Sequence, residues 1–200
     1  MYTLYEMPLS GNCYKARLCM QQLGIPFRRV DVDLISGVQY GDAFKRMNLN
    51  SKVPVLQLDD HTFLAESNAM LWYLAEGTHL LPASRLAHAQ VLQWMFFEQY
   101  SHEPYIATVR YWLRFSGNPA AYRADIQRCR PRGYKALDVM EQHLQKHLFF
   151  VENQYSIADI ALYAYTHTAQ EGEFDLQRYP AIRAWLRRIE TTSAFVSMAA

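Results

Sequence analysis

The sequence predicts two structural parts, a mixed α/β part at the N-terminus and an all-helical part after it. Up to about Gly77, short runs of β-forming residues alternate with amphipathic helical patterns. Beyond that glycine every segment has a helical pattern, and the residues from Gly77 to Pro82 are typical of a linker. We therefore expect domains over residues 1–77 and 86–200, joined by a linker over 78–85.

The first strand, loop and helix form the most informative segment of the chain. Residues 2–5 are β-forming, and residues 13–23 place apolar side chains at helical spacing. Between strand and helix the chain runs Ser-Gly-Asn-Cys-Tyr-Lys-Ala-Arg, from Ser10 to Arg17. A helix N-terminus has unpaired N–H groups and about half a positive charge. We therefore expect this loop to favour an anion.

A second helix in the N-terminal part begins with a carboxylate and a hydroxyl, at Glu66 and Ser67. It follows three further predicted strands, over residues 27–34, 53–58 and 62–64. Pro54 stands near the entrance of its strand, where a residue that cannot donate a hydrogen bond is tolerated. Glu66 suits an ammonium group, and Ser67 at a helix N-terminus suits a carboxylate. The pair therefore predicts a zwitterionic ligand.

Four segments taken together resemble the cytosolic glutathione transferases. In chain order they are residues 10–17, 52–56 (Lys-Val-Pro-Val-Leu), 66–69 (Glu-Ser-Asn-Ala) and 156–159 (Ser-Ile-Ala-Asp). The resemblance covers nearly all of the chain, from Tyr2 to about Ala194. It implies an α/β thioredoxin-like N-terminal domain that binds glutathione, and an all-α C-terminal domain that forms most of the second-substrate pocket.

The resemblance implies that Ser10, Asn12 or both activate the glutathione sulfur. Theta and zeta classes have a serine at the place of Ser10, whereas the nu class uses a threonine and an asparagine, and Asn12 matches that asparagine. Both donors are present, so the subclass stays open. A thiol at a helix N-terminus can have a lowered pKa, so Cys13 could form a mixed disulfide, although theta-class sequences have a cysteine there that is not a nucleophile. Lys15 and Arg17 are predicted to be solvated or structural.

The remainder of the glutathione site is also implied by the resemblance. The residues expected to bind glutathione are Gln39, Lys52, Val53, Pro54, Glu66 and Ser67. Glu66 and Ser67 would bind the γ-glutamyl end. The Val53–Pro54 bond is predicted to be cis, which would turn the Val53 backbone toward the ligand. Lys52 would lie near the glycine carboxylate.

An aromatic-rich helical pattern over residues 85–115 opens the second part of the chain. The aromatic side chains within residues 94–106 are too dense to face one direction, so core, dimer interface and electrophile pocket are all candidate roles. We predict core for most of them. Three residues are assigned to the electrophile pocket, namely Tyr105, Val109 and Trp112.

Two local patterns in the second part predict details of helix structure. Pro131 lies within a helical pattern, so a kink or break is expected near Arg130. Ser156 and Asp159 have the spacing of a capping box, which is usually a structural device.

Composition limits the class of protein. The chain has 200 residues, 50% of them hydrophobic, and a net charge of +1, which offers no basic surface for nucleic acid. No apolar run approaches the roughly 20 residues needed to span a bilayer, and no secretion signal is seen at the N-terminus. Three cysteines form no metal or disulfide pattern, so no metal site is predicted and a reducing cytoplasm is expected.

These observations predict a cytoplasmic glutathione transferase with a role in detoxification. Glutathione would be its co-substrate, with no prosthetic group, and a hydrophobic small-molecule electrophile would be the second substrate. The resemblance implies a homodimer. A glutathione-dependent disulfide reductase and a non-catalytic glutathione-binding or scaffold protein remain alternatives. The electrophile itself stays open, because apolar pockets have no sequence code.

Overall fold

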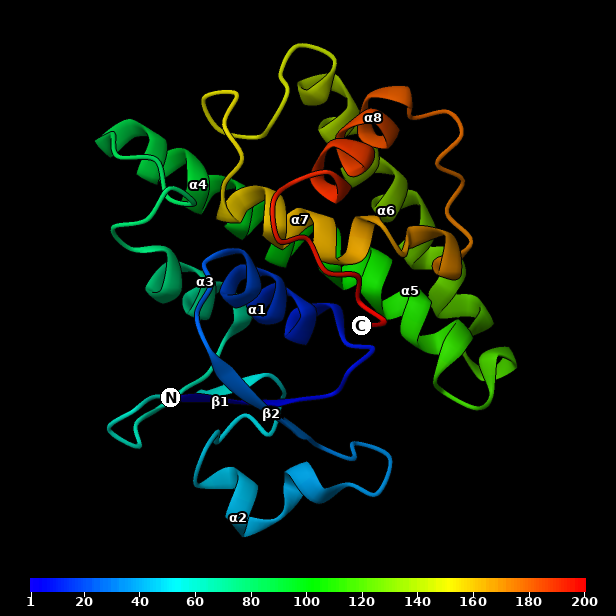
Figure 1. Cartoon of the computed structure of the whole chain (residues 1–200). Coiled ribbons are helices and arrows are strands. Elements are labelled where there is room, and N and C mark those ends of the chain that lie inside the picture. Colours follow the sequence, from blue (N-terminus) through cyan, green and yellow to red (C-terminus); the bar gives the residue numbers. More distant parts are fainter. The chain divides into compact units, whose positions relative to one another are not determined.

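The computed structural model describes residues 1–200 and divides into two compact units. The first unit comprises Met1–Thr78 together with Ser193–Ala200, and the second comprises His79–Thr192. The first unit contains all the named strands, and the second contains only helices as its named elements (Figure 1). The predicted order of an α/β part followed by an all-α part is confirmed.

The first unit is a four-stranded sheet with helices, built as a βαβ segment followed by a ββα segment. Its elements are β1 Tyr2–Glu6, α1 Gly11–Gln22, β2 Phe27–Asp31, the short 3₁₀ helix η1 Val38–Tyr40, α2 Asp42–Lys45, β3 Val55–Gln57, β4 Phe63–Leu64 and α3 Ser67–Ala75. The strand order is β2-β1-β3-β4, with β1 parallel to β2 and antiparallel to β3. Helices α1 and α3 pack against each other, so their N-termini belong to one layer.

Strands β2, β3 and β4 are shorter than the sequence predicts, whereas β1 and α1 are each one residue longer. Strand β2 ends at Asp31, because its partner β1 ends at Glu6, the residue paired with Asp31. The predicted cis bond between Val53 and Pro54 is confirmed, and β3 begins only after it. Helix α1 begins two residues before the expected start, because Ser10 has an extended backbone and caps the helix there.

The second unit is all helical. Its elements are α4 Arg85–Phe97, the π-helical turn η2 Glu98–His102, α5 Glu103–Arg114, the 3₁₀ helix η3 Pro119–Tyr122, α6 Arg123–Leu144, α7 Ile157–Thr166, the 3₁₀ helix η4 Ala169–Gly172 and α8 Pro180–Glu190. None of the helices combines the length and apolar character that a membrane span requires.

Two prolines affect the long helices differently from what the sequence predicts. The expected helix over residues 85–115 contains the π-helical turn η2, which ends just before Pro104. Proline has no N–H for the carbonyl four residues earlier, so the wider turn accommodates the missing bond. Of the kink or break predicted near Arg130, the break is wrong, because α6 runs through Pro131 as one helix. Pro131 is exposed, so water can bind the carbonyl of Gln127 that it leaves unpaired.

The core of the second unit surrounds α7, whose ten residues are all buried. The predicted capping box is confirmed at its N-terminus, where Ser156 and Asp159 bond reciprocally. The Asp159 carboxylate also accepts hydrogen bonds from Trp185 Nε1 at 2.9 Å and from the Phe150 N–H at 3.2 Å. Burial raises the pKa of Asp159 to about 7 despite these donors. This one carboxylate therefore connects α7, α8 and the segment before α7.

The aromatic stretch over residues 94–106 is only partly core. Trp94, Met95 and Ile106 are buried, which agrees with the prediction. Phe96 is 67% exposed and Tyr100 is 83% exposed, so for these two the core assignment is wrong. The physical reason is that one helix offers only one stripe to a core, and these side chains lie outside it.

Gly133 in α6 provides a test of core packing. A Cβ atom at this position would lie 2.5 Å from the Phe174 ring, which is buried and cannot swing into solvent. In an open helix Gly→Ala stabilises by roughly 0.5–1 kcal/mol. Here we expect Gly133→Ala to lower the free energy of unfolding by about 1–3 kcal/mol, measured by urea denaturation. Lys135→Ala on the exposed side of α6 is the control and should change it by less than about 0.5 kcal/mol. A stabilised Gly133→Ala protein would contradict this packing.

Candidate functional site

Ser10 is the N-cap residue of α1, and its hydroxyl lies at the helix N-terminus. Its backbone is extended (φ −79°, ψ 123°), and its Oγ accepts from the Cys13 N–H at 3.4 Å. The Ser10 N–H donates to the Met7 carbonyl at 2.9 Å, which closes the preceding turn. The Ser10 side chain also hydrogen-bonds the Cys13 thiol, where it acts against the effect of burial on the thiol pKa.

A hydrogen bond joins the first turns of α1 and α3. Ser67 Oγ donates to Asn12 Oδ1 at 3.2 Å. Ser67 is buried and is the first residue of α3, whereas Asn12 is half-buried. Asn12 Oδ1 is therefore the acceptor in this pair. Two helix N-termini therefore converge beside a side-chain amide, an arrangement that favours an anionic ligand.

Glu66 has an unusual backbone for a residue that is not glycine. It stands immediately before α3 with φ 67° and ψ 110°, and its side chain is exposed. A positive φ costs such a residue of order 1–3 kcal/mol and persists only where the surroundings impose it. The strained backbone presents a solvent-facing carboxylate at the N-terminus of α3.

The other predicted glutathione residues lie between β2 and β3. Gln39 is buried, and its Oε1 has no hydrogen-bond partner within the protein. Lys52 is exposed, and its carbonyl accepts from Asn48 Nδ2 at 2.8 Å. The Val53 side chain packs against a buried apolar cluster of the first unit, and Pro54 is buried. No hydrogen bond joins Gln39 or Lys52 to the pair at the helix N-termini.

Cys13 has the opposite character from a reactive thiol. It is fully buried, and its Sγ accepts from the Met7 N–H at 3.4 Å. Burial raises its pKa to about 12, so desolvation outweighs the nearby helix N-terminus and the thiol stays protonated at neutral pH. Cys19 also lies in the core, and burial raises its pKa to about 12.

Lys15 and Arg17 are both buried, so the expectation of solvated side chains is wrong and the structural alternative holds. Arg17 forms a buried ion pair with Glu6, the last residue of β1, which sequence analysis did not single out. The available signal was a carboxylate at the end of a central strand with two arginines, Arg17 and Arg29, in the neighbouring elements.

The three residues predicted for the electrophile pocket have different surroundings in the second unit. Tyr105 lines a cavity of about 260 Å³ beside α6, and its hydroxyl accepts from Arg132 at 3.2 Å. Val109 is fully buried, so it offers no surface to a ligand. The Trp112 ring stacks on Tyr122 with centroids 5.3 Å apart. Only Tyr105 of the three lines this cavity.

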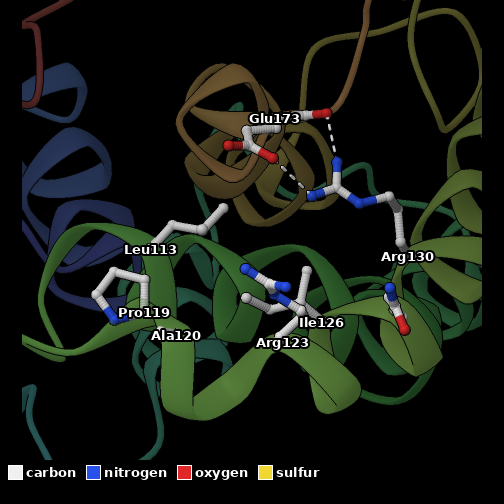
Figure 2. A pocket seen from close by; sticks show the side chains of 8 residues that line it. Leu113, Pro119, Ala120, Arg123, Ile126, Arg130 and Glu173 are labelled. Atoms are coloured by element: carbon white, nitrogen blue, oxygen red, sulfur yellow. Dashed lines mark hydrogen bonds and ion pairs between the residues drawn. The ribbon is translucent and has the colours of Figure 1, made fainter.

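A second cavity in the same unit has a volume of about 580 Å³ and is shown in Figure 2. Arg130 pairs with Glu173 at its rim, with Nη2 2.9 Å from Oε2 and Nη1 2.7 Å from the main-chain oxygen. Its lining residues are Leu113, Pro119, Ala120, Arg123, Ile126, Gln127, Arg130 and Glu173. None of the residues predicted for the electrophile pocket is among them.

Comparison with known proteins places both parts of the chain in one family. The model of the glutathione S-transferase N-terminal domain matches residues 9–76, and that of the C-terminal domain matches residues 94–192. A glutathione S-transferase from Pseudomonas fluorescens Pf-5, solved as a crystal structure, is 49% identical to this chain with a TM-score of 0.97. That match covers 100% of this chain and 99% of the other.

Two more distant relatives are informative about chemistry. The disulfide-bond oxidoreductase YfcG of Escherichia coli K12 is 29% identical over 203 residues, which cover 97% of this chain and 92% of the relative. A glutathione transferase from Burkholderia graminis, crystallised with two glutathione molecules bound per subunit, is 25% identical with a TM-score of 0.85. That match covers 96% of this chain and 85% of the other.

The hydrogen bond between Ser67 and Asn12 predicts energetic coupling. We expect Asn12→Ala and Ser67→Ala each to lower the free energy of unfolding, and the double variant to lose less than the sum by about 0.5–1.5 kcal/mol. Urea denaturation of the wild type, the two single variants and the double variant measures these free energies of unfolding. Ser84 caps α4 through a local bond to the Ala87 N–H, so Asn12→Ala with Ser84→Ala should be additive. Additivity of the first pair would show that its hydrogen bond contributes nothing.

Proposed function

The chain belongs to the glutathione S-transferase family, and we propose that it activates the glutathione thiol for attack on a hydrophobic electrophile. The observation that carries the proposal is the hydrogen bond from Ser67 to Asn12, which brings the N-termini of α1 and α3 to one place. Ser10 adds a hydroxyl at the first of these helix ends.

Thiol activation follows from the donors that these residues offer. A free thiol titrates near 8.5, so only a few per cent is thiolate at neutral pH. A hydrogen bond to a charged acceptor contributes about 1.5–3 kcal/mol, or roughly 1–2 pKa units. Ser10 donates its hydroxyl hydrogen to the sulfur and Asn12 donates from Nδ2. Two such donors beside a helix N-terminus make thiolate the main form of bound glutathione.

The γ-glutamyl end of glutathione is assigned to Glu66 and Ser67. The exposed Glu66 carboxylate pairs with the ammonium group, and the strained backbone of this residue supports a functional role. The Ser67 Oγ hydrogen is already donated to Asn12, so the Ser67 N–H, at the N-terminus of α3, binds the carboxylate. The Val53 backbone and Lys52 bind the cysteinyl and glycine portions, and Gln39 lies toward the glycine end.

The electrophile is assigned to the second unit. Tyr105 and Trp112 offer aromatic surface to a hydrophobic molecule, whereas Val109 supports them from the core. In the reaction the thiolate sulfur forms a bond to an electrophilic carbon, and the leaving group departs with the electron pair. The thiol proton has by then passed to solvent. We also propose a cytoplasmic homodimer, supported by the exposed Phe96 and Tyr100, and a monomer in sedimentation velocity would contradict it.

A glutathione-dependent disulfide reductase is the second candidate, favoured by Asn12 and by the relative that is a disulfide-bond oxidoreductase. Here the glutathione thiolate attacks a disulfide sulfur and expels one thiolate. A second glutathione thiolate then attacks the mixed disulfide, which gives glutathione disulfide and the second thiol. Turnover of an aryl halide, a hydroperoxide and a small mixed disulfide separates the two functions. Activity with the disulfide alone would favour the reductase, and glutathione binding without any turnover would favour a scaffold.

The donors to sulfur can be separated by mutation. Ser10→Ala should raise the pKa of the bound glutathione thiol by about one unit and lower kcat with little change in glutathione affinity. Asn12→Ala should raise the thiol pKa and lower kcat in the same way if the Asn12 amide also donates to the sulfur. The double variant should lose more activity than either single variant. An ultraviolet titration of the bound thiolate, together with steady-state kinetics, measures both effects.

Cys13→Ser is the matched control for these variants. The serine hydroxyl can still accept from the Met7 N–H, and the reacting sulfur belongs to glutathione. We therefore expect conjugation to persist. Loss of activity in Cys13→Ser alone would replace this mechanism with one based on a protein thiol.

Glu66→Gln tests the γ-glutamyl assignment. Removal of the charge should weaken glutathione binding by about 1.5–3 kcal/mol, because the ammonium loses its counter-charge. The melting temperature should barely change, since Glu66 is exposed and its backbone conformation is retained. Calorimetric titration with glutathione measures the dissociation constant. An unchanged constant would show that Glu66 does not contact the ligand.

A further inference from the structure

One guanidinium in the first unit joins three separate segments of the chain. Arg17 lies in α1 with only 3% of its surface exposed. Its Nε is 3.4 Å from Glu6 Oε2 at the end of β1. Its Nη2 donates to the Pro8 carbonyl at 2.9 Å and to the Met198 carbonyl at 2.9 Å. Arg17 therefore connects the sheet, the loop before α1 and the C-terminal segment.

The loop that Arg17 binds is the one that positions Ser10. Pro8 is two residues before Ser10, and the turn between them is closed by the Ser10 N–H donating to the Met7 carbonyl. The Met7 N–H in turn donates to Cys13. Arg17 adds a hydrogen bond from a buried cation to this loop, at the Pro8 carbonyl. A donor to sulfur must be held within about 0.5 Å of its productive place, so a bond at Pro8 bears directly on Ser10.

Residues 193–200 cover the other side of the guanidinium. This segment belongs to the first unit, although α8 of the second unit precedes it in sequence. The Tyr14 hydroxyl donates to the Val196 carbonyl at 2.7 Å, and Met198 is buried beside Arg17. Figure 1 shows the red C-terminal segment returning toward α1. Water is thus kept from Arg17, which strengthens its hydrogen bonds.

We propose that Arg17 is a positioning residue for Ser10, and that residues 193–200 keep its guanidinium in the orientation that binds the Pro8 carbonyl. The inference rests on the proposed thiol activation. Glu6 pairs with both Arg17 and Arg29, and Arg17→Lys keeps the charge of this cluster, so the effect of that substitution is one of geometry rather than of net charge. The other ionisable groups around Arg17 are Arg29, Tyr14 and Cys13.

Arg17→Lys is the principal test. Lysine keeps a charge for Glu6, but a single ammonium lacks the planar set of donors that reaches Glu6, Pro8 and Met198 together. We expect the pKa of the bound glutathione thiol to rise by about one unit, which lowers the thiolate fraction near neutral pH. We expect kcat to fall with it, while KM for glutathione changes less than about twofold.

Two further variants separate positioning from general stability. Tyr14→Phe removes only the hydroxyl that holds the Val196 carbonyl, and should raise the thiol pKa by a few tenths of a unit in a fully folded chain. Arg29→Gln is the matched control. Arg29 pairs with Glu6 and donates to the Ala200 carbonyl at 3.0 Å, but it forms no bond to the loop. The Arg29→Gln variant should therefore have a lower melting temperature and an unchanged pKa of the bound thiol.

Each outcome decides the inference. An unchanged pKa of the bound thiol in folded Arg17→Lys overturns the positioning role. A rise of this pKa in Arg29→Gln as large as that in Arg17→Lys also overturns it, because a general loss of structure would then explain both. If Arg17→Lys does not fold, the Tyr14→Phe variant decides. A thiol pKa in Tyr14→Phe equal to that in the wild-type protein overturns the role of the C-terminal segment. A wild-type protein that does not lower the thiol pKa at all refutes the proposed function itself. A normal wild-type titration that no variant alters refutes only the positioning role.

Discussion

The burial of the Glu6 carboxylate is the constraint on which the first unit depends. A charge with no exposed surface must be compensated, because the cost of desolvation otherwise reaches several kcal/mol. Glu6 ends the central strand β1, and its two partners come from α1 and β2. Arg17 is itself nearly buried, so its remaining donors need acceptors, which are main-chain carbonyls. One buried charge thereby ties sheet, helix, loop and C-terminal segment together.

This arrangement supports the proposal that the loop before α1 acts on a ligand thiol rather than on a protein thiol. The loop is held by a buried cysteine whose pKa is raised by desolvation. The hydroxyl and amide at the helix ends, Ser10 and Asn12, remain partly accessible. A sulfur bound there meets donors, while Cys13, one residue further along, lies in the apolar interior. The difference between the two sulfur environments is one of solvent access and hydrogen bonding, not of distance along the chain.

Sequence reasoning succeeded where a local rule governs. The capping box at Ser156 and Asp159 depends on a few adjacent residues, and the cis bond before Pro54 follows the family resemblance. It failed where distant partners decide. The π-helical turn before Pro104 and the unbroken helix at Pro131 arise from the same residue type, and only exposure and register distinguish them. The aromatic stretch likewise divided between core and surface, with Trp94 buried and Phe96 and Tyr100 exposed.

The sequence by itself determined the order of an α/β part and a helical part, because hydrophobic period and turn residues act over short distances. It also indicated the residues at the two helix N-termini, since capping residues stand beside the helices they begin. Only the tertiary structure decided that Ser67 bonds to Asn12, that Cys13 is desolvated, and that Arg17 links Glu6 to the loop of Ser10. Such contacts join distant residues: Asn12 and Ser67 are 55 positions apart, and Arg17 and Met198 are 181 positions apart. Burial and hydrogen-bond geometry between distant segments depend on how the whole unit packs, which local sequence pattern does not encode.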